Sequence, residues 1–575
     1  MQAQRIIIIH PGSLYLRIGR ASDLNPVTVL HAVAYLRREN RNAQTYRDVL
    51  LPQVQNTTEI LTEFEEQRLQ VSHSIQSYAP PQESYERNAK RLRVVTPPQQ
   101  IATFNRRSVP EDLPLSHEKD KNEFDGNKGD ITKPEILFDE DILLLHENEA
   151  SNYNIHFPMK RGEFNVHKNV GGSTAAALSN MENIWLYVLK KHLNINANTL
   201  PQYSAVLVIS DVYNRSHLRE FTNLLLQRLR FRSCFLLQEH VAATFGAGLS
   251  YACVVDIGDQ KSSISCVEDG ISHPETRVRL AYGGGDVTQV FFNLLRKCCF
   301  PYKECNVEKD YADAALLMNL KERYCHLTLD VCGAQERCFE VKKFKKRTRY
   351  TLQIGDECVV APLSLFHTEL VNLTGKAKQA HVQLRSSQQA DSEDCFDAEY
   401  IRETGRRNGG RDQLLEGTLP LTGETAEDDL VVDDVVERDS NLKTSDKDEL
   451  LYINNGQILP IDQAIVRSIE RCATEEIKRK MYSCILLVGG SSKFTGFAKW
   501  LEQRVMLQLS ATCSSSSTPA FEVNVFTKEM DAGMIAWKGA AIMSCLESAP
   551  ELWIYASEWE KYGLRILREK APFIW

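Results

Sequence analysis

The sequence lacks the features that mark membrane and secreted proteins. It contains no uninterrupted run of about 18 apolar residues, so no segment is expected to span a membrane. The four isoleucines at 6–9 are followed directly by His-Pro-Gly, and so short an apolar stretch does not make a signal peptide. With 43% hydrophobic and 25% charged residues, the composition is typical of globular proteins, and we expect the chain to stay inside the cell.

Cysteine is absent before Cys234, and no Cys-x-x-Cys pair of the kind that binds zinc occurs. The 15 cysteines lie mostly among apolar residues, as in YACVVDIG at 251–258, where a free thiol behaves as a small hydrophobic group. We therefore expect buried, reduced cysteines rather than a metal or redox site. The adjacent Cys298 and Cys299 are the one pair that stands apart.

Two long stretches, 51–150 and 371–452, are polar and broken by proline, glycine or runs of charge. Between 371 and 450 there are 19 acidic and 10 basic residues, whereas the whole chain carries a net charge of −8. A nearly neutral body therefore carries an acidic appendage. Segments this polar bury too little apolar area to offset the entropy of ordering, which predicts two long, largely disordered insertions.

The rest of the chain alternates between strands of the buried type and amphipathic helices. Strands are predicted at 205–210, 234–238 and 252–258, with helices at 216–231 and 240–248 between them. This order predicts an α/β fold in which helices pack on the faces of a sheet.

One strand–turn–strand pattern occurs twice. IIIIHPGSLYLRIGR (6–20) and ACVVDIGDQKSSISCVEDG (252–270) each consist of an apolar strand, a turn with glycine and a return strand. The repetition favours two related half-molecules with a cleft between them. The alternative is a chance similarity of two hairpins.

The turns of these hairpins are suited to a phosphate. Facing turns with glycine can grip a triphosphate through backbone N–H groups. Asp256 could hold the water shell of Mg²⁺, and Asp259 could orient an attacking water. A third element at 484–505 consists of a strand, a loop with Gly489 and Gly490, and an amphipathic helix. The two glycines alone could form a simple tight turn, but the three elements together indicate a nucleotide site.

Five segments carry a family resemblance: HPGSLYLRIGR, YNIHFPMKRGEFNVH, LQEHVAATFGAGLSYACVVDIGDQKSSISCVEDG, MYSCILLVGGSSKFTGF and the ending MIAWKGAAIMSCLESAPELWIYASEWEKYGLRILREKAPFIW. In them the sequence resembles the actin superfamily and, within it, the actin-related protein 8 family. The resemblance implies an actin-like two-lobed α/β fold, in which duplicated ribonuclease-H-like domains enclose a nucleotide cleft.

In chain order the resemblance implies a first phosphate hairpin with the start of the outer lobe (1–50), a polar basic insertion (51–150), the remainder of the outer lobe (151–246) and a second phosphate hairpin with the inner lobe (247–370). An acidic insertion (371–452), the inner lobe with an adenosine loop (453–534) and a return to the outer lobe (535–575) follow.

The resemblance also implies which residues bind ATP. They come from the two phosphate loops, from a pair beside the nucleoside and from the adenosine loop, and they are Gly12, Ser13, Arg17, Asp256, Gly258, Asp259, Lys321, Glu322, Gly489, Gly490 and Phe494. Asp256 would also be the residue on the Mg²⁺ side, and Gln238 would help to place an attacking water.

Four departures from the actin pattern bear on catalysis. His10 replaces the aspartate of the first loop, and Pro11 has no N–H to offer. Leu14 replaces a glycine, so its side chain would crowd the phosphates, and Ser263 replaces a water-orienting histidine. Because metal and aligned water supply most of the catalysis of phosphoryl transfer, we assign no catalytic residue and expect any bound ATP and Mg²⁺ to be structural. A new role for His10 as base or metal ligand is disfavoured, since no second histidine or cysteine lies nearby in sequence.

Two basic clusters, 87–107 and 342–349, offer contacts to DNA phosphates. Both also fit a solvated surface or a nuclear import signal. The acidic stretch 424–439 would repel DNA but could engage histone tails. The candidate DNA-binding residues are Arg87, Lys90, Arg91, Arg93, Arg106 and Arg107.

By resemblance, the chain would be a non-catalytic subunit of a nuclear chromatin-remodelling complex of the INO-eighty type, acting in nucleosome and DNA engagement, DNA repair and recombination, and transcription regulation. Its partners would be actin, another nuclear actin-related protein, the motor subunit, histones and DNA, with no membrane. Two other classes stay open: an active ATPase or sugar kinase of the same superfamily, and a component of cytoskeletal filaments. The missing first-loop carboxylate counts against the former, and the two insertions count against the latter.

Overall fold

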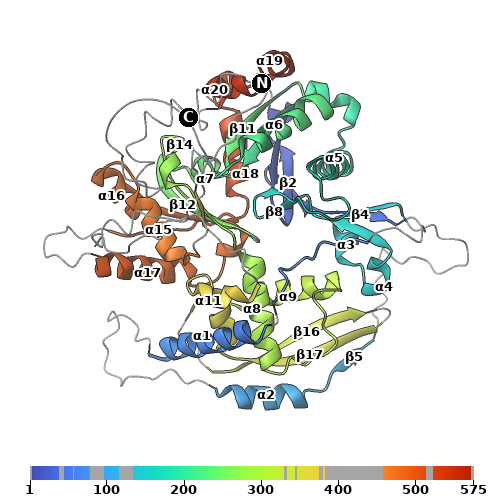
Figure 1. The fold of residues 1–575 in the computed structure, drawn as a ribbon, viewed down its shortest axis with the longest axis vertical. Coiled ribbons are helices and arrows are strands. Elements are labelled where there is room, and N and C mark those ends of the chain that lie inside the picture. The colour runs from blue at the N-terminus through green and yellow to red at the C-terminus, as the bar shows by residue number, and fades with distance from the viewer. Residues whose placement is uncertain are drawn as a thin grey trace, which may run out of the picture.

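A computed structural model describes residues 3–37, 45–55, 57–77, 96–114, 134–328, 333–343, 346–374, 380–382, 458–512 and 522–571. Two large mixed sheets form the centres of two lobes (Figure 1). Within these ranges, no helix is both long and apolar enough to cross a membrane.

The outer lobe is built on a six-stranded sheet in the order β21-β11-β10-β1-β2-β3. β1 pairs in parallel with β10 and antiparallel with β2, and β10 pairs in parallel with β11. The four isoleucines of β1 are fully buried because their side chains alternate between two apolar clusters, one on each face of the sheet. The strands are β1 Ile6–Pro11, β2 Tyr15–Arg20, β3 Val27–Leu30, β10 Ser204–Ile209, β11 Ser233–Gln238 and β21 Ile554–Tyr555.

The inner lobe repeats this arrangement in the order β18-β15-β13-β12-β19-β20, with β14 beside β13. β12 pairs antiparallel with β13 and in parallel with β19, and β19 pairs in parallel with β20. The same succession of pairings in both lobes confirms the predicted duplication. The strands are β12 Tyr251–Ile257, β13 Ser262–Glu268, β14 Ile271–Ser272, β15 Val278–Leu280, β18 Ala380–Val382, β19 Ile485–Val488 and β20 Val525–Phe526.

Two helices, α7 (Glu239–Ala247) and α18 (Ile535–Ser544), share one apolar cluster with strands of both large sheets. They pack so closely that a Cβ on Gly539 would lie 1.7 Å from the Ala242 carbonyl oxygen. Trp537 on α18 is fully buried and donates its indole N–H to the carbonyl of Ile8 at 3.2 Å. The C-terminal part of the chain is thereby fixed against β1.

Smaller elements complete the lobes. β4 (Val33–Leu36) lies between β6 (Ile136–Phe138) and β7 (Tyr153–His156), and β8 (Met159–Lys160) pairs with β9 (Glu163–Phe164). The remaining α-helices are α3 Glu140–Leu143, α4 Glu147–Ala150, α5 Thr174–Lys191, α6 Arg215–Asn223, α8 Gly284–Lys297, α9 Tyr311–Tyr324, α10 Glu357–Leu363, α11 Thr368–Val371, α15 Ile461–Glu470, α16 Glu475–Ser483, α17 Phe497–Thr512, α19 Ala556–Tyr562 and α20 Leu567–Lys570. Short 3₁₀ helices are η1 Ala3–Arg5, η2 Ala197–Gln202, η4 Pro274–Thr276, η5 Asn372–Thr374, η6 Gly490–Ser492, η7 Ala549–Leu552 and η8 Gly563–Ile566.

The polar stretch 51–150 contains more regular structure than its composition predicts. Helix α1 (Thr58–Ser77) packs against α10 and α11 of the inner lobe. It buries Phe64, Val71 and Ile75 at helical spacing, and these three residues lie among many charged and amide side chains. The expectation of a largely disordered first insertion is therefore wrong for this part.

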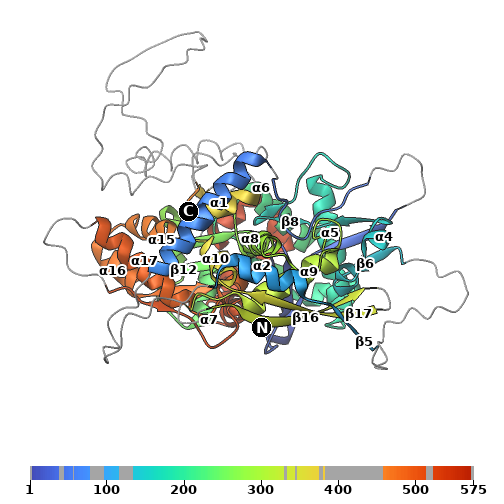
Figure 2. The ribbon, with the colours of Figure 1, turned by 90° about the horizontal axis from the view of Figure 1, so that it is seen from below.

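The same correction applies to α2 (Pro98–Arg107) and β5 (Glu111–Leu113). β5 extends the hairpin of β16 (Gln335–Lys343) and β17 (Lys346–Ile354), and α2 packs on β17 (Figure 2). The buried Asn105 amide donates to two main-chain carbonyls at 2.8 and 3.0 Å, which fixes α2 in place.

The other predicted elements can be compared directly. The strands expected at 205–210, 234–238 and 252–258 are β10, β11 and β12, each displaced by no more than one residue. The helix expected at 216–231 is α6 followed by a π-helical turn, Leu224–Arg228, in which three consecutive leucines are buried. The described cysteines are free thiols and most are buried, as predicted. Most of the acidic stretch 371–452 lies outside the described residues, so its predicted disorder stays a prediction.

Candidate functional site

The first hairpin contains a tight turn that requires glycine. The Gly12 N–H donates to the Tyr15 carbonyl at 2.9 Å, and a Cβ on Gly12 would lie 2.6 Å from that oxygen. Nδ1 of His31 is hydrogen-bonded to the Gly12 carbonyl at 2.8 Å. The Ser13 hydroxyl accepts a bond from the Gly162 N–H at 3.4 Å. The turn is therefore held from both sides, with small side chains at its tip.

The second hairpin meets the adenosine loop at Asp256. Parallel pairing of β12 and β19 places Asp256 beside Val488, the last residue of its strand. Gly489 follows with a φ of 90°, and a Cβ there would lie 2.3 Å from Oδ1 of Asp256. The Gly258 N–H closes its own turn by donating to the Lys261 carbonyl at 2.9 Å. Glycine is thus required where the loop passes the carboxyl group.

Electrostatic interactions link the two hairpins. Burial, together with the carboxylates of Asp259 and Glu322, raises the pKa of Tyr15 to about 12. Burial lowers the pKa of Arg17, whereas the neighbouring Asp256 raises it. Residues of both predicted phosphate loops and of the predicted nucleoside pair therefore lie close enough to interact electrostatically.

The predicted nucleoside end is also assembled. Lys321 is buried, and its Nζ lies 5.9 Å from the centroid of the Phe494 ring. Ser491 approaches the start of α8 so closely that a Cβ on Gly284 would lie 2.0 Å from Oγ of Ser491. A Cβ on Gly490 would meet no atom within 4 Å, so open space adjoins this glycine. The roles of these residues toward a nucleotide stay predictions.

A charged cluster that the sequence analysis missed lies beside the first hairpin. Nε2 of His10 is 2.9 Å from Oε1 of Glu239, and Nζ of Lys261 pairs with the other carboxylate oxygen of Glu239. Lys261 also donates to the Ser210 hydroxyl at 3.3 Å. A cavity of about 60 Å³ adjoins these side chains. At the position where the resemblance to actins implies a carboxylate, this chain has a histidine that is hydrogen-bonded to a buried ion pair.

The cluster changes the protonation of the site. Burial alone would raise the pKa of Glu239, but Lys261 and His10 outweigh it and hold that pKa well below its ordinary value. Burial and the nearby negative charge of Glu239 raise the pKa of Asp256 well above its usual range. Burial lowers the pKa of His10, which favours the neutral ring. A neutral imidazole supplies no negative charge in place of a carboxylate, and Asp256 favours its proton, so the nucleotide-free site offers less negative charge to a catalytic metal.

The Gln238 side chain is buried and engaged in hydrogen bonds, so it is not available to place a water as predicted. Its side-chain amide donates to the Asp211 carbonyl at 3.2 Å and accepts from Arg277 at 3.4 Å. Glu239, the next residue, begins α7 and is the side chain that reaches His10. The junction of β11 and α7 thus presents a carboxylate to the cleft rather than an amide.

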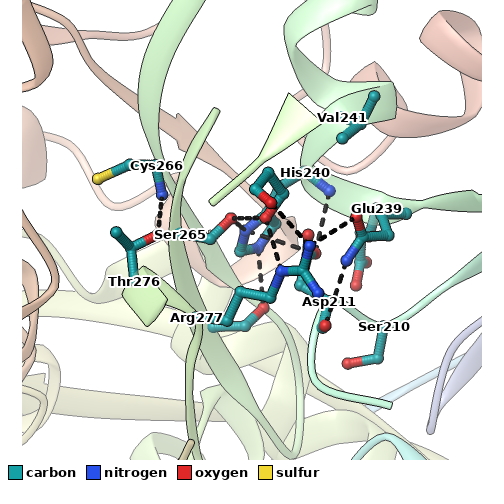
Figure 3. A network of polar contacts seen from close by, with 12 residues as sticks. Ser210, Asp211, Glu239, His240, Val241, Ser265, Cys266, Thr276 and Arg277 are labelled. Carbon is teal, nitrogen blue, oxygen red and sulfur yellow. Dashed lines mark hydrogen bonds and ion pairs between the residues drawn. The ribbon is translucent and has the colours of Figure 1, made fainter. Parts of the chain in front are cut away.

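Ser263 lies on a buried network that is shown in part in Figure 3. The His240 ring is hydrogen-bonded through Nε2 to the Ser263 hydroxyl at 3.0 Å and through Nδ1 to the Ser265 hydroxyl at 2.7 Å. The His240 N–H donates to a carboxylate oxygen of Asp211 at 3.1 Å. Because both ring nitrogens are engaged and the ring is fully buried, His240 does not replace the missing water-orienting histidine.

Leu14 differs from its prediction. Its side chain is only 4% exposed and belongs to an apolar cluster that also contains Leu30 and Leu51. The side chain is therefore packed within the protein, whereas the sequence analysis expected it to crowd the phosphates.

Two buried polar atoms at the cleft have no hydrogen-bond partner among the described residues: Oδ2 of Asp259 and Nδ1 of His10. Buried polar atoms are normally satisfied, so these two favour a polar ligand or water at this place. A triphosphate with hydrated Mg²⁺ fits the donor set, since Asp256 and Asp259 offer oxygen ligands and the glycine turns leave room for phosphate oxygens.

The candidate DNA-binding residues are only partly described. Arg106 and Arg107 are exposed at the C-terminal end of α2, whereas Arg87, Lys90, Arg91 and Arg93 lie outside the described residues. The second basic cluster, 342–349, is paired with neighbouring acids through Arg347–Glu340, Arg349–Glu340, Lys346–Asp112 and Lys343–Asp313. These pairs favour the interpretation of that cluster as a solvated hairpin edge.

Comparisons with known proteins agree with this geometry. The family model described as Actin matches residues 1–572. The chain is 53% identical over 584 residues to actin-related protein 8 of Aedes aegypti, covering 100% of this chain and 98% of that protein, and 35% identical over 613 residues to actin-related protein 8 of Homo sapiens, covering 100% and 93%. Among solved structures, it is similar to human actin-related protein Arp8 in its ATP-bound state, with a TM-score of 0.77, 32% identity, and coverage of 99% of this chain and 97% of that chain. The chain belongs to the actin family, among relatives named actin-related protein 8.

Proposed function

We propose that this chain is a non-catalytic, ATP-binding actin-related subunit of a nuclear chromatin-remodelling complex. The His10–Glu239–Lys261 cluster at the first phosphate hairpin is the main observation that supports a loss of catalysis. Phosphoryl transfer needs a metal held between the loops and a positioned water. In this cleft one carboxylate is replaced by a buried histidine, and the others are tuned by an ion pair that the chain supplies itself.

ATP binding is supported by the residues that remain. Lys321 and Glu322 would hold the nucleoside end, the turns at Gly12 and Gly258 would offer N–H groups to phosphate oxygens, and Asp256 would hold hydrated Mg²⁺. When bound, ATP would supply negative charge between the lobes and stabilise the closed fold by mass action. The ATP-bound state of the human relative is consistent with this assignment.

The binding proposal is tested by thermal unfolding with and without Mg²⁺-ATP. We expect stabilisation of about 3 kcal/mol when ATP is present at about 100 times its Kd. Asp256→Ala should remove most of this effect, whereas Glu547→Gln, which alters an exposed carboxylate far along the chain, should retain it. An ATP-dependent shift of equal size in Asp256→Ala would contradict the assignment.

Membership of a remodelling complex is proposed from the family and from the two insertions that filament-forming actins lack. The expected partners are actin, a second nuclear actin-related protein, a DNA-translocating motor subunit and nucleosomes. Affinity purification of the tagged full chain from nuclear extract should recover the first three in stoichiometric amounts. Recovery of the chain as a cytosolic monomer, or within filaments, would overturn the proposal.

DNA binding is proposed for the cluster 87–107, in which Arg106 and Arg107 extend from the anchored helix α2. Replacing both arginines with glutamine should weaken DNA binding and lower its salt slope by up to about one unit for each lost phosphate contact. Arg347→Gln, which removes an arginine already paired with Glu340, is the matched control. An unchanged salt slope in the double variant would leave the cluster as a solvated surface.

A further inference from the structure

Outside the cleft, two histidines and an aspartate gather in the outer lobe. Asp48, His156 and His167 each offer one ligand atom, and these atoms all lie within 4.8 Å of one another. Asp48 and His156 are buried and His167 is half-buried. The three come from separate parts of the chain: the segment before α1, the end of β7 and the loop that follows β9. We propose that they bind one divalent transition-metal ion of the zinc type.

The first argument is that one nitrogen of each imidazole ring is buried and lacks a hydrogen-bond partner. Nδ1 of His156 and Nδ1 of His167 have no hydrogen-bond partner in the described structure, and neither ring is hydrogen-bonded to the Asp48 carboxylate. A buried ring nitrogen without a hydrogen-bond partner is costly, and a bound ion would use its lone pair.

The second argument is that the carboxylate is already oriented. Asp48 accepts hydrogen bonds from the Asn165 amide at 3.0 and 3.2 Å, from the Phe157 N–H at 2.9 Å and from the Tyr46 hydroxyl at 2.8 Å. Metal-binding carboxylates are typically held in this way by groups around them. The Tyr46 ring stacks on both imidazoles, with centroids 4.0 Å from His167 and 5.5 Å from His156.

The third argument is that glycines make room for the rings. Gly171 has a φ of 76°, and a Cβ there would lie 2.4 Å from Cε1 of His156. A Cβ on Gly172 would lie 2.4 Å from Nδ1 of His167. Larger residues at either position would displace an imidazole, so the loop is shaped around the pair. A cavity of about 300 Å³ is lined in part by Asp48 and Asn165.

The donor set selects the class of ion. Two imidazoles and one carboxylate suit Zn²⁺ and similar ions, whereas Mg²⁺ and Ca²⁺ prefer oxygen ligands. A tetrahedral ion bonded at about 2.0–2.1 Å holds its ligand atoms about 3–3.5 Å apart, so from separations of up to 4.8 Å the cluster would contract by at most about 2 Å. With three protein ligands, at least one position is left for water. The ion would tie β7 to the two segments that flank it.

The experiment uses the full chain, purified without a histidine tag and stripped with chelator. Titration with Zn²⁺ and with Co²⁺ should give one bound ion per chain and a rise in Tm with Zn²⁺. The Co²⁺ spectrum should show the visible bands of a tetrahedral site without the thiolate charge-transfer band that binding to cysteine would give. His167→Gln and Asp48→Asn should each weaken binding at least tenfold, and His192→Gln, at an exposed histidine in the same lobe, should not.

The outcomes separate the alternatives. Retention of Zn²⁺ affinity in both His167→Gln and Asp48→Asn, or a Co²⁺ spectrum with thiolate bands, would overturn the proposal. If the two variants fail to fold, the unaltered chain still decides the question. A Tm that is unchanged by Zn²⁺, with no ion bound in stoichiometric amount, would show that the cluster does not bind the metal.

Discussion

Asp259→Asn should stabilise the nucleotide-free protein, and the gain should depend on pH. Burial raises the pKa of Asp259 from an ordinary value near 3.8 to about 7; Lys321 lowers it, and Asp286 and Glu322 add to the rise. A shift of this size corresponds to at most about 4 kcal/mol of charge cost in the folded state. Because Asp259 keeps partial contact with solvent, screening reduces the cost, and we expect about 1–3 kcal/mol.

The sign follows from proton linkage. Below about pH 4, Asp259 is protonated in the folded and unfolded states and contributes no difference. Between pH 4 and 7 the unfolded chain releases the proton first, so the folded state loses stability as the pH rises, and above pH 7 the cost is constant. Urea unfolding of wild type and Asp259→Asn at pH 5 and pH 8 should therefore show a larger gain at pH 8. An equal gain in stability at pH 5 and pH 8, or a variant less stable than wild type, would refute this reasoning. Glu547→Gln is the control for the loss of one exposed charge.

Two further predictions concern the groups that position the cleft. Lys261→Met should destabilise the protein by about 3–5 kcal/mol at pH 7, because it leaves the buried Glu239 carboxylate without its lysine partner. Urea unfolding measures this loss, and a loss below about 1 kcal/mol would contradict the buried Lys261–Glu239 ion pair. Gly539→Ala should lower the free energy of unfolding by more than about 3 kcal/mol, since the added Cβ would lie 1.7 Å from the Ala242 carbonyl oxygen. A near-neutral effect on Tm would show that α7 and α18 do not pack as described.

The sequence was sufficient to predict the duplicated hairpins because their signal is local. An apolar strand, a turn with glycine and a return strand occupy one continuous stretch, and Gly12 and Gly489 lie where a Cβ would meet a carbonyl or carboxylate oxygen. Pairing of each hairpin with later parallel strands then follows from the α/β pattern.

The charged cluster could not be predicted in the same way. His10 and Glu239 are 229 residues apart, and only the folded outer lobe brings them to 2.9 Å. The error of one residue at Gln238 has a similar cause, because the residue that faces the cleft at the junction of β11 and α7 depends on where the strand ends. Helix α1 was missed since its buried residues are few among polar ones, and tertiary packing rather than composition orders it.

The central claim is that this cleft holds ATP without hydrolysing it. The most direct test incubates the purified full chain with Mg²⁺-ATP for many hours, separates the protein and identifies the nucleotide that stays bound. We predict that the bound nucleotide is intact ATP, that phosphate release equals the background without protein, and that Asp256→Ala binds no nucleotide. Bound ADP with stoichiometric or multiple-turnover phosphate release, abolished by Asp256→Ala, would contradict the account.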